Sequence, residues 1–231
     1  MSMYKLNVKG QEFDIREDYT LREWVDLQKW DASIEANWPR LLAEATGMSL
    51  DQAKEIPLET MQVAIGLLMV TLSPDHVKLK DIIEDHSLLD FNQITFGQFA
   101  DLEVLLSRDP RKTLPKMIGV LYSCKFTEDW LLRDAWPALQ KYLVFRKSVY
   151  NNYKALFEID DIDEGTVEDI KDQGHAWYDM IMVLADEKFL NIEHVVDRPL
   201  TEAFNFLAWK KDKAIKEQQL IQKQRQQQRR R

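Results

Sequence analysis

Short capping-box sequences recur along the chain, and they constrain its fold more than any other feature. In each of them a Thr or Ser is followed three residues later by Glu or Gln, at the start of a helix-forming stretch. The paired side chains hydrogen-bond to each other's backbone N–H groups, which otherwise lack partners at a helix start. The three pairs are Thr20 with Glu23, Ser49 with Gln52, and Thr95 with Gln98. Thr166, with Asp169 three residues later, predicts a further helix start.

Apolar residues at helical spacing follow these starts, and only seven of the 231 residues are glycine. We therefore predict eight to nine helices. Leu58–Leu72 is apolar on nearly every side, which predicts a fully buried helix. The predicted helices are Thr20–Ile34, Pro39–Gly47, Ser49–Pro57, Leu58–Leu72, Thr95–Asp109, Thr113–Cys124 with Pro115 in its first turn, Thr127–Phe157 kinked or divided at Pro137, Thr166–Asp186, and one from Leu200 onward.

The first 18 residues differ from the rest, because apolar and polar side chains alternate on both sides of Gly10. This alternation predicts a β-hairpin with glycine in its turn. A weaker alternation at 76–80 predicts a short strand. The fold class is therefore mainly α, a multi-helix bundle with a small N-terminal β-hairpin and a protruding C-terminal helix. The predicted domains are the hairpin (1–18), a helical domain (19–209) with a sub-boundary at the acidic loop 158–166, and an extension (210–231).

Charge is distributed unevenly over the chain, whose formal net charge is −8. Residues 210–231 hold nine basic and two acidic residues, a local charge of +7. The remainder holds 22 basic and 37 acidic residues, a charge of −15. In the last helix we expect Phe204, Phe206, Leu207 and Trp209 in the core, and we expect the Gln-rich residues beyond them to be polar on all sides.

Several protein classes are excluded by composition and by the lengths of apolar runs. The single cysteine, Cys124, excludes an intrachain disulfide and a Cys-rich zinc site, and we interpret it as an inert core thiol. The longest apolar run, Val63–Leu72, is too short to span a bilayer. The N-terminus lacks an apolar signal core with a small-residue cleavage site. We therefore expect a soluble, intracellular protein that does not bind membranes.

No motif predicts catalysis, cofactor binding or metal binding. The acidic loop at 160–165 fails as a calcium-binding EF-hand loop in both registers, because Gly165 or Ile162 falls where an oxygen ligand is required. His175 and Asp179 share a helix face without a recognisable third ligand. The chain contains no GxSxG, GxGxxG or GxxxxGK[ST] sequence. We expect no enzyme and no cofactor.

The basic extension and the acidic loop are instead the candidate partner-binding surfaces. An exposed extension, a docking arm for an acidic partner or for another copy, and a nucleic-acid-binding segment are the alternative interpretations. Nucleic acid is the least favoured, because the acidic remainder of the chain repels phosphates and no recognition motif is present. The candidate residues are Lys210, Lys211, Lys213, Lys216, Lys223, Arg225, Arg229, Arg230, Arg231, Asp160, Asp161, Asp163 and Glu164.

Three groups of segments resemble proteins encoded among the tail genes of tailed bacteriophages. Residues 41–49, with Thr46-Gly47 at a helix end, and 53–58 resemble tail assembly chaperones, as does the hairpin leading into 21–24. Residues 94–103 and 114–122 are similar to segments of uncharacterised phage tail-module proteins, and the stretch from Val195 to Lys210 is similar to the end of that group.

This resemblance implies a non-enzymatic protein that acts by protein–protein interaction in virion assembly. In that family the partner is the tape-measure protein, which the chaperone binds in the host cytoplasm before the tail tube polymerises. Alternatives are a structural virion component of the tail, neck or baseplate, and a nucleic-acid-binding accessory protein. Self-association is a further alternative.

Overall fold

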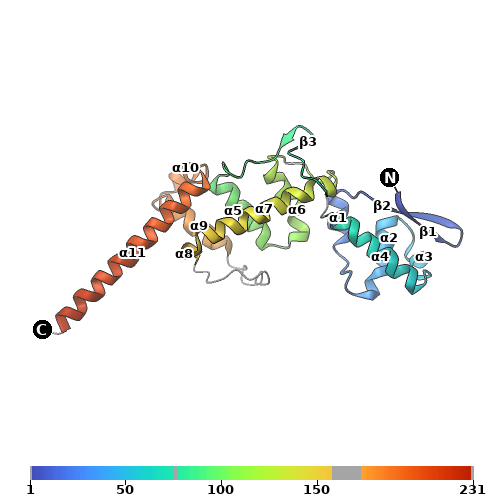
Figure 1. The fold of residues 1–231 in the computed structure, drawn as a ribbon, viewed down its shortest axis with the longest axis horizontal. Helices are drawn as coiled ribbons and strands as arrows, with labels where there is room; N and C mark the ends of the chain where they lie inside the picture. The colour runs from blue at the N-terminus through green and yellow to red at the C-terminus, as the bar shows by residue number, and fades with distance from the viewer. Residues whose placement is uncertain (1, 75–76, 158–172, 230–231) are drawn as a thin grey trace. The chain divides into compact units, whose positions relative to one another are not determined.

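The computed structural model describes residues 2–74, 77–157 and 173–229, and it is mainly α-helical, as predicted (Figure 1). The chain divides into two compact units. Unit 1 comprises residues 1–88 and 109–141, and unit 2 comprises residues 89–108 and 142–231. Among the described residues, no helix is both long enough and apolar enough to cross a membrane.

Unit 1 combines two small antiparallel strand pairs with helices. Its elements are β1 (Ser2–Val8), β2 (Gln11–Arg16), α1 (Leu21–Leu27), the 3-10 helix η1 (Glu35–Asn37), α2 (Trp38–Thr46), α3 (Leu50–Lys54), α4 (Leu58–Leu72), β3 (Ile82–Ile83), β4 (His86–Ser87), α6 (Pro110–Leu121) and the first part of α7 (Leu132–Asn152).

Unit 2 is helical throughout its described elements. These are α5 (Phe96–Ser107), the second part of α7, α8 (Lys154–Phe157), α9 (Gln173–Leu184), the 3-10 helix η3 (Phe189–Asn191), α10 (Ile192–Val196) and α11 (Leu200–Arg229).

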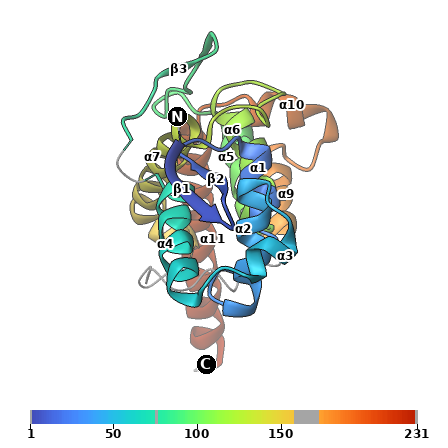
Figure 2. The ribbon, with the colours of Figure 1, turned by 90° about the vertical axis from the view of Figure 1, so that its right-hand side faces the viewer.

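The predicted N-terminal hairpin is present as β1 and β2. Lys9 and Gly10 adopt φ angles of 51° and 85° at its turn, which suits a tight hairpin connection. Ile15 on β2 is fully buried, and β2 contacts α2 and α4, beside which it lies in Figure 2. A lone hairpin is marginally stable in water, so this packing explains why the hairpin persists.

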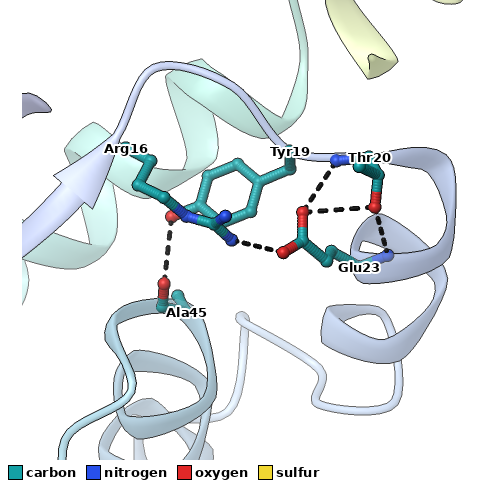
Figure 3. A network of polar contacts seen from close by, with 5 residues as sticks. All are labelled: Arg16, Tyr19, Thr20, Glu23 and Ala45. Atoms are coloured by element: carbon teal, nitrogen blue, oxygen red, sulfur yellow. Dashed lines mark hydrogen bonds and ion pairs between the residues drawn. The ribbon is translucent and has the colours of Figure 1, made fainter. Parts of the chain in front are cut away.

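Polar contacts fix the end of the hairpin to α1 (Figure 3). The Arg16 guanidinium donates to Glu23 Oε1 (2.7 Å) and lies 4.7 Å from the centre of the Tyr19 ring. The Thr20 N–H donates to Glu23 Oε2 (2.8 Å), and the Glu23 N–H donates to Thr20 Oγ1 (3.2 Å), which completes the predicted capping box. Burial acts to raise the pKa of Glu23, but the hydrogen bonds from Thr20 and Arg16 outweigh it and lower this pKa.

The same capping box also connects two helix starts in unit 1. The N–H of Leu21 donates to the Trp130 carbonyl (2.9 Å), and the N–H of Leu132 donates to the Tyr19 carbonyl (2.8 Å). Thr20 is therefore paired across an isolated antiparallel bridge with Leu131, the residue that precedes α7. The first turns of α1 and α7 are fixed side by side.

Unit 2 repeats this arrangement with a different capping box. The N–H of Phe96 donates to the Arg198 carbonyl (2.8 Å), and the N–H of Leu200 donates to the Ile94 carbonyl (2.9 Å). Thr95 of this capping box is paired with Pro199, which precedes α11. The bridge fixes the start of α11 beside that of α5.

The first helix is shorter than predicted. It ends at Leu27, so Trp30 and Ile34 lie outside it, and Ile34 is 50% exposed. Asp31 Oδ1 accepts hydrogen bonds from the Ser33 N–H (2.9 Å) and hydroxyl (2.7 Å). Such local side-chain bonds compete with helical backbone bonds and favour a turn.

Helix α4 has the predicted bounds but is not fully buried. Ala64 and Leu68 have no exposed surface, whereas Val63 and Val70, on the opposite face, are 63% and 62% exposed. The prediction of complete burial was wrong, because unit 1 covers only one face of this helix.

Two other helix starts also differ from the prediction. Helix α6 begins at Pro110 rather than Thr113, which places Pro115 inside the helix. Helix α7 begins at Leu132 rather than Thr127. The buried Thr127 hydroxyl donates to the Pro115 carbonyl (2.6 Å), so Thr127 holds the connecting loop onto α6 instead of starting a helix.

The strand predicted at 76–80 is not present among the described residues 77–80. The short strands β3 and β4 follow instead, joined by Glu84 and Asp85 with φ angles of 46° and 67°. Positive φ angles at two consecutive residues are typical of the two-residue loop of a β-hairpin. The apolar–polar alternation at 76–80 did not predict this turn.

Candidate functional site

Helix α11 has a packed part and an exposed part. Its buried residues, Leu200, Ala203, Phe204 and Leu207, pack in unit 2, where the Phe204 ring lies against several other aromatic rings, among them that of Trp177. From residue 212 to residue 227 every side chain is exposed. Figure 1 shows α11 continuing past the other helices of unit 2. We call residues 210–229 the arm.

The structure places seven of the predicted partner-binding residues on the arm. These are Lys210, Lys211, Lys213, Lys216, Lys223, Arg225 and Arg229. The other six, Arg230, Arg231, Asp160, Asp161, Asp163 and Glu164, lie outside the described residues, as does the loop considered as an EF-hand.

The first two lysines of the arm bind within unit 2. Lys211 Nζ donates to the carbonyls of Ala155 (2.7 Å) and Leu156 (3.3 Å) in α8. Lys210 Nζ donates to the Val183 carbonyl (3.1 Å), close to the end of α9. Ammonium groups interact favourably with carbonyls at helix C-termini. These two residues attach α11 to α8 and α9 within unit 2.

Two aromatic residues that were predicted to lie in the core, Phe206 and Trp209, are exposed where the arm begins. Phe206 is 45% exposed and Trp209 is 55% exposed, with ring centroids 5.6 Å apart. Lys210 Nζ lies 5.8 Å from the Phe206 ring centre, and Lys213 Nζ lies 5.5 Å from the Trp209 ring centre. Both distances allow cation–π attraction. The prediction of burial was wrong, because only one side of α11 faces the core here.

Beyond this cluster the basic side chains extend into solvent. Lys213 approaches Glu217 at 3.9 Å, a weak i,i+4 pair. Lys216, Lys223 and Arg225 have no ion-pair or hydrogen-bond partner among the side chains that the structure describes. Their charge is available to another molecule.

A buried polar cluster in unit 2 has a different character. The Glu103 carboxyl is completely buried and accepts hydrogen bonds from the hydroxyls of Tyr142 (2.8 Å) and Tyr150 (2.7 Å) and from Arg146 Nε (2.7 Å). Burial, reinforced by Glu103, raises the pKa of both tyrosines. All three of these partners come from α7, so the cluster joins α5 to the second part of α7 within unit 2.

Sequence reasoning missed this cluster, although two signals were present. Glu103 lies four residues after Phe99 and seven after Phe96, and therefore falls on the apolar face of its helix. Tyr142, Arg146 and Tyr150 are spaced at intervals of four, which places their polar groups on one face. A charged residue on a core face requires such partners.

Unit 1 contains a half-open pocket of about 270 Å³. Among its lining residues Asp31 is the one charged side chain, and Asp31 Oδ1 already accepts hydrogen bonds from Ser33. A site for a polar ligand needs several converging polar groups, which this lining lacks. The pocket is lined by Leu27, Gln28, Trp30, Asp31, Ala32, Ser33, Leu41, Met69 and Leu72.

The remaining candidates for chemistry supply no site in the described parts of the chain. Within them, no group of three or more His, Cys, Asp and Glu residues is placed to hold a metal ion. Cys124 lies beyond the end of α6 and is half-buried, not in the core as predicted, because the chain turns at Ser123 (φ 51°). The arm is therefore the best candidate functional site.

No family model, curated protein or solved structure matches this chain.

Proposed function

We propose that the protein is a non-enzymatic assembly factor that binds a helical partner protein through the arm. The observation that carries this proposal is the continuous exposure of α11 from residue 212 to residue 227, a length of about 24 Å. This surface includes uncompensated cations together with exposed apolar residues, of which Leu220 is 59% and Ile221 48% exposed.

The energetics of isolated helices support a docking role for such an arm. A helix that buries no face is marginally stable in water, because most helix stability in proteins comes from packing. A partner helix laid against the arm would cover its apolar side chains and supply the missing packing. The arm would then be ordered most firmly in the complex.

The resemblance to phage tail-module proteins suggests which partner this is. It implies a tail assembly chaperone, whose partner is the tape-measure protein, a long helical chain. Apolar side chains along that helix would need cover before the tail polymerises, and an exposed helical arm can provide it. The place of action would be the host cytoplasm.

A truncation tests the proposed function. The full chain and a form lacking Gln218–Arg231 would each be co-expressed with the neighbouring tail proteins, including the tape-measure protein, and purified by a tag. We expect the full chain to retain its partner through purification and the truncated form to lose it. Equal retention by both forms would show that the arm is not the binding site.

A further inference from the structure

One face of the arm carries a regular stripe of side chains. The stripe consists of positions spaced alternately by four and three residues, which keeps them on one side of an α-helix. It extends about 27 Å along the helix axis. Its members are Trp209, Lys213, Lys216, Leu220, Lys223 and Gln227.

The stripe combines two apolar anchors with three cations. Trp209 and Leu220, 55% and 59% exposed, are 11 residues or about 16 Å apart on the stripe. Lys213 and Lys216 lie between them, and Lys223 follows one turn after Leu220. The stripe contains no acidic residue.

The two carboxylates of the arm lie outside this face. At 100° per residue, Asp212 borders the stripe on one side and Glu217 borders it on the other. A nucleic-acid duplex or an anionic membrane is wide enough to meet both carboxylates, whereas a single helix lying along the stripe contacts mainly the lysines and the anchors. The geometry favours a narrow partner.

The lysines also exclude pairing of the stripe with the same stripe of a second copy. If two copies of the stripe packed together, the stripe residues of one helix would face those of the other. Whether the two helices ran parallel or antiparallel, each lysine would face another lysine or an apolar residue. Like charges at a helix interface are repulsive. The complementary surface must supply carboxylates.

We propose that the stripe binds one acidic amphipathic helix of the partner protein. That helix presents Asp or Glu opposite the three lysines and apolar residues opposite Trp209 and Leu220. This inference rests on the proposed function and specifies the chemistry of the partner.

A synthetic peptide of about 21 residues, long enough to cover the stripe, serves as the probe. It carries Glu at the three facing positions and Leu at the two anchor positions, and a second peptide carries Gln in place of Glu. Binding of each fluorescently labelled peptide to the full chain is measured by anisotropy at low and high salt. We expect the Glu peptide to bind about tenfold more tightly than the Gln peptide at low salt, and the difference to shrink at high salt.

Two variants with the same change in net charge distinguish binding at the stripe from binding elsewhere on the arm. The variant K213Q/K216Q/K223Q removes three positive charges from the stripe, and A214E/Q218E/Q222E changes the charge by the same amount on the opposite face. We expect the first to weaken binding of the Glu peptide about tenfold and the second to leave it within about twofold. Likewise Leu220→Ala should weaken binding more than Ile215→Ala, whose side chain lies off the stripe.

Other outcomes would overturn the proposal. In the peptide assay, these are no measurable binding of the Glu peptide and equal losses of binding in the two charge variants. Tighter binding of single-stranded DNA or of anionic vesicles than of the Glu peptide would also overturn it. So would a dimer of the full chain, seen in sedimentation, that K213Q/K216Q/K223Q abolishes. If the truncated chain loses its partner in co-purification while K213Q/K216Q/K223Q and Leu220→Ala retain it, the proposed function stands and the stripe is wrong.

Discussion

At the scale of single residues, Glu103 shows how a charged group can belong to a core. Its carboxyl is covered completely and accepts three hydrogen bonds from side chains of α7, while Arg146, with 26% of its side chain exposed, supplies a positive charge. A buried carboxylate in this position is tolerated only because each partner is present.

We predict that Glu103→Gln lowers the free energy of unfolding by about 3 kcal/mol. The substitution leaves the Arg146 guanidinium without its counter-charge and turns an amide N–H₂ towards donors. Equilibrium denaturation measures the loss, and Glu187→Gln, at an exposed turn, is the control expected to change stability little. Equal stabilities of the two variants would contradict the role assigned to Glu103.

Tyr122 gives a prediction for alkaline pH. Burial, with added repulsion from Asp81 and Asp134, raises the pKa of Tyr122 to about 12. Between the ordinary tyrosine pKa of about 10 and this value, the unfolded chain loses the proton while the folded chain retains it, so stability falls as pH rises. Below a pH of about 10 the hydroxyl is protonated in both states, so its contribution to the free energy of unfolding is fully present.

The variant Tyr122→Phe isolates this effect. It removes the hydrogen bond to the Lys80 carbonyl (2.6 Å), which should cost about 1 kcal/mol at neutral pH. It should also make unfolding free energy fall less steeply between about pH 10 and 12. Denaturation series at neutral and alkaline pH measure both effects, and identical slopes for the two proteins would contradict the assignment.

At the scale of elements, residue spacing predicted where capped helices begin better than it predicted which of their side chains are buried. Thr20, Ser49 and Thr95 form capping boxes in the structure because their partners are local, three residues away. The exposure of Val63 and Trp209 depends on which other elements cover them, and periodicity within one helix does not contain that information.

Two glycines in helices should respond oppositely to alanine. A Cβ at Gly97 in α5 would lie 2.9 Å from Val196 Cβ and 3.1 Å from the Val196 carbonyl oxygen, whereas a Cβ at Gly66 in α4 meets nothing within 4 Å. We predict that Gly97→Ala destabilises the protein by about 1–3 kcal/mol and that Gly66→Ala stabilises it by about 0.5–1 kcal/mol. Denaturation midpoints test both, and the same sign at the two positions would contradict the packing of α10 on α5.

At the scale of the whole molecule, the sequence predicted the fold class and the protruding helix, but only part of the candidate site. The charge split located the arm, since nine basic residues cluster after Trp209. It did not show that Lys210 and Lys211 bind carbonyls of unit 2, because those carbonyls come from α9 and α8. Long-range interactions of this kind require the tertiary structure.

Removing Gln218–Arg231 should leave both units folded. The side chains of residues 218–227 are exposed, and no hydrogen bond or ion pair joins them to the rest of the described chain. We predict an unchanged thermal midpoint and a loss of helical circular dichroism limited to the deleted residues. A lower midpoint would show that this segment contributes to the core.

Amide hydrogen exchange along the arm tests most directly whether it is the partner-binding site. The full chain would be measured alone and in complex with the partner identified by co-purification. We predict that exchange of residues 212–227 slows markedly in the complex while the core amides of α5 and α9 change little, because binding supplies packing that the arm lacks. Unchanged exchange along the arm in a formed complex would contradict the proposed function.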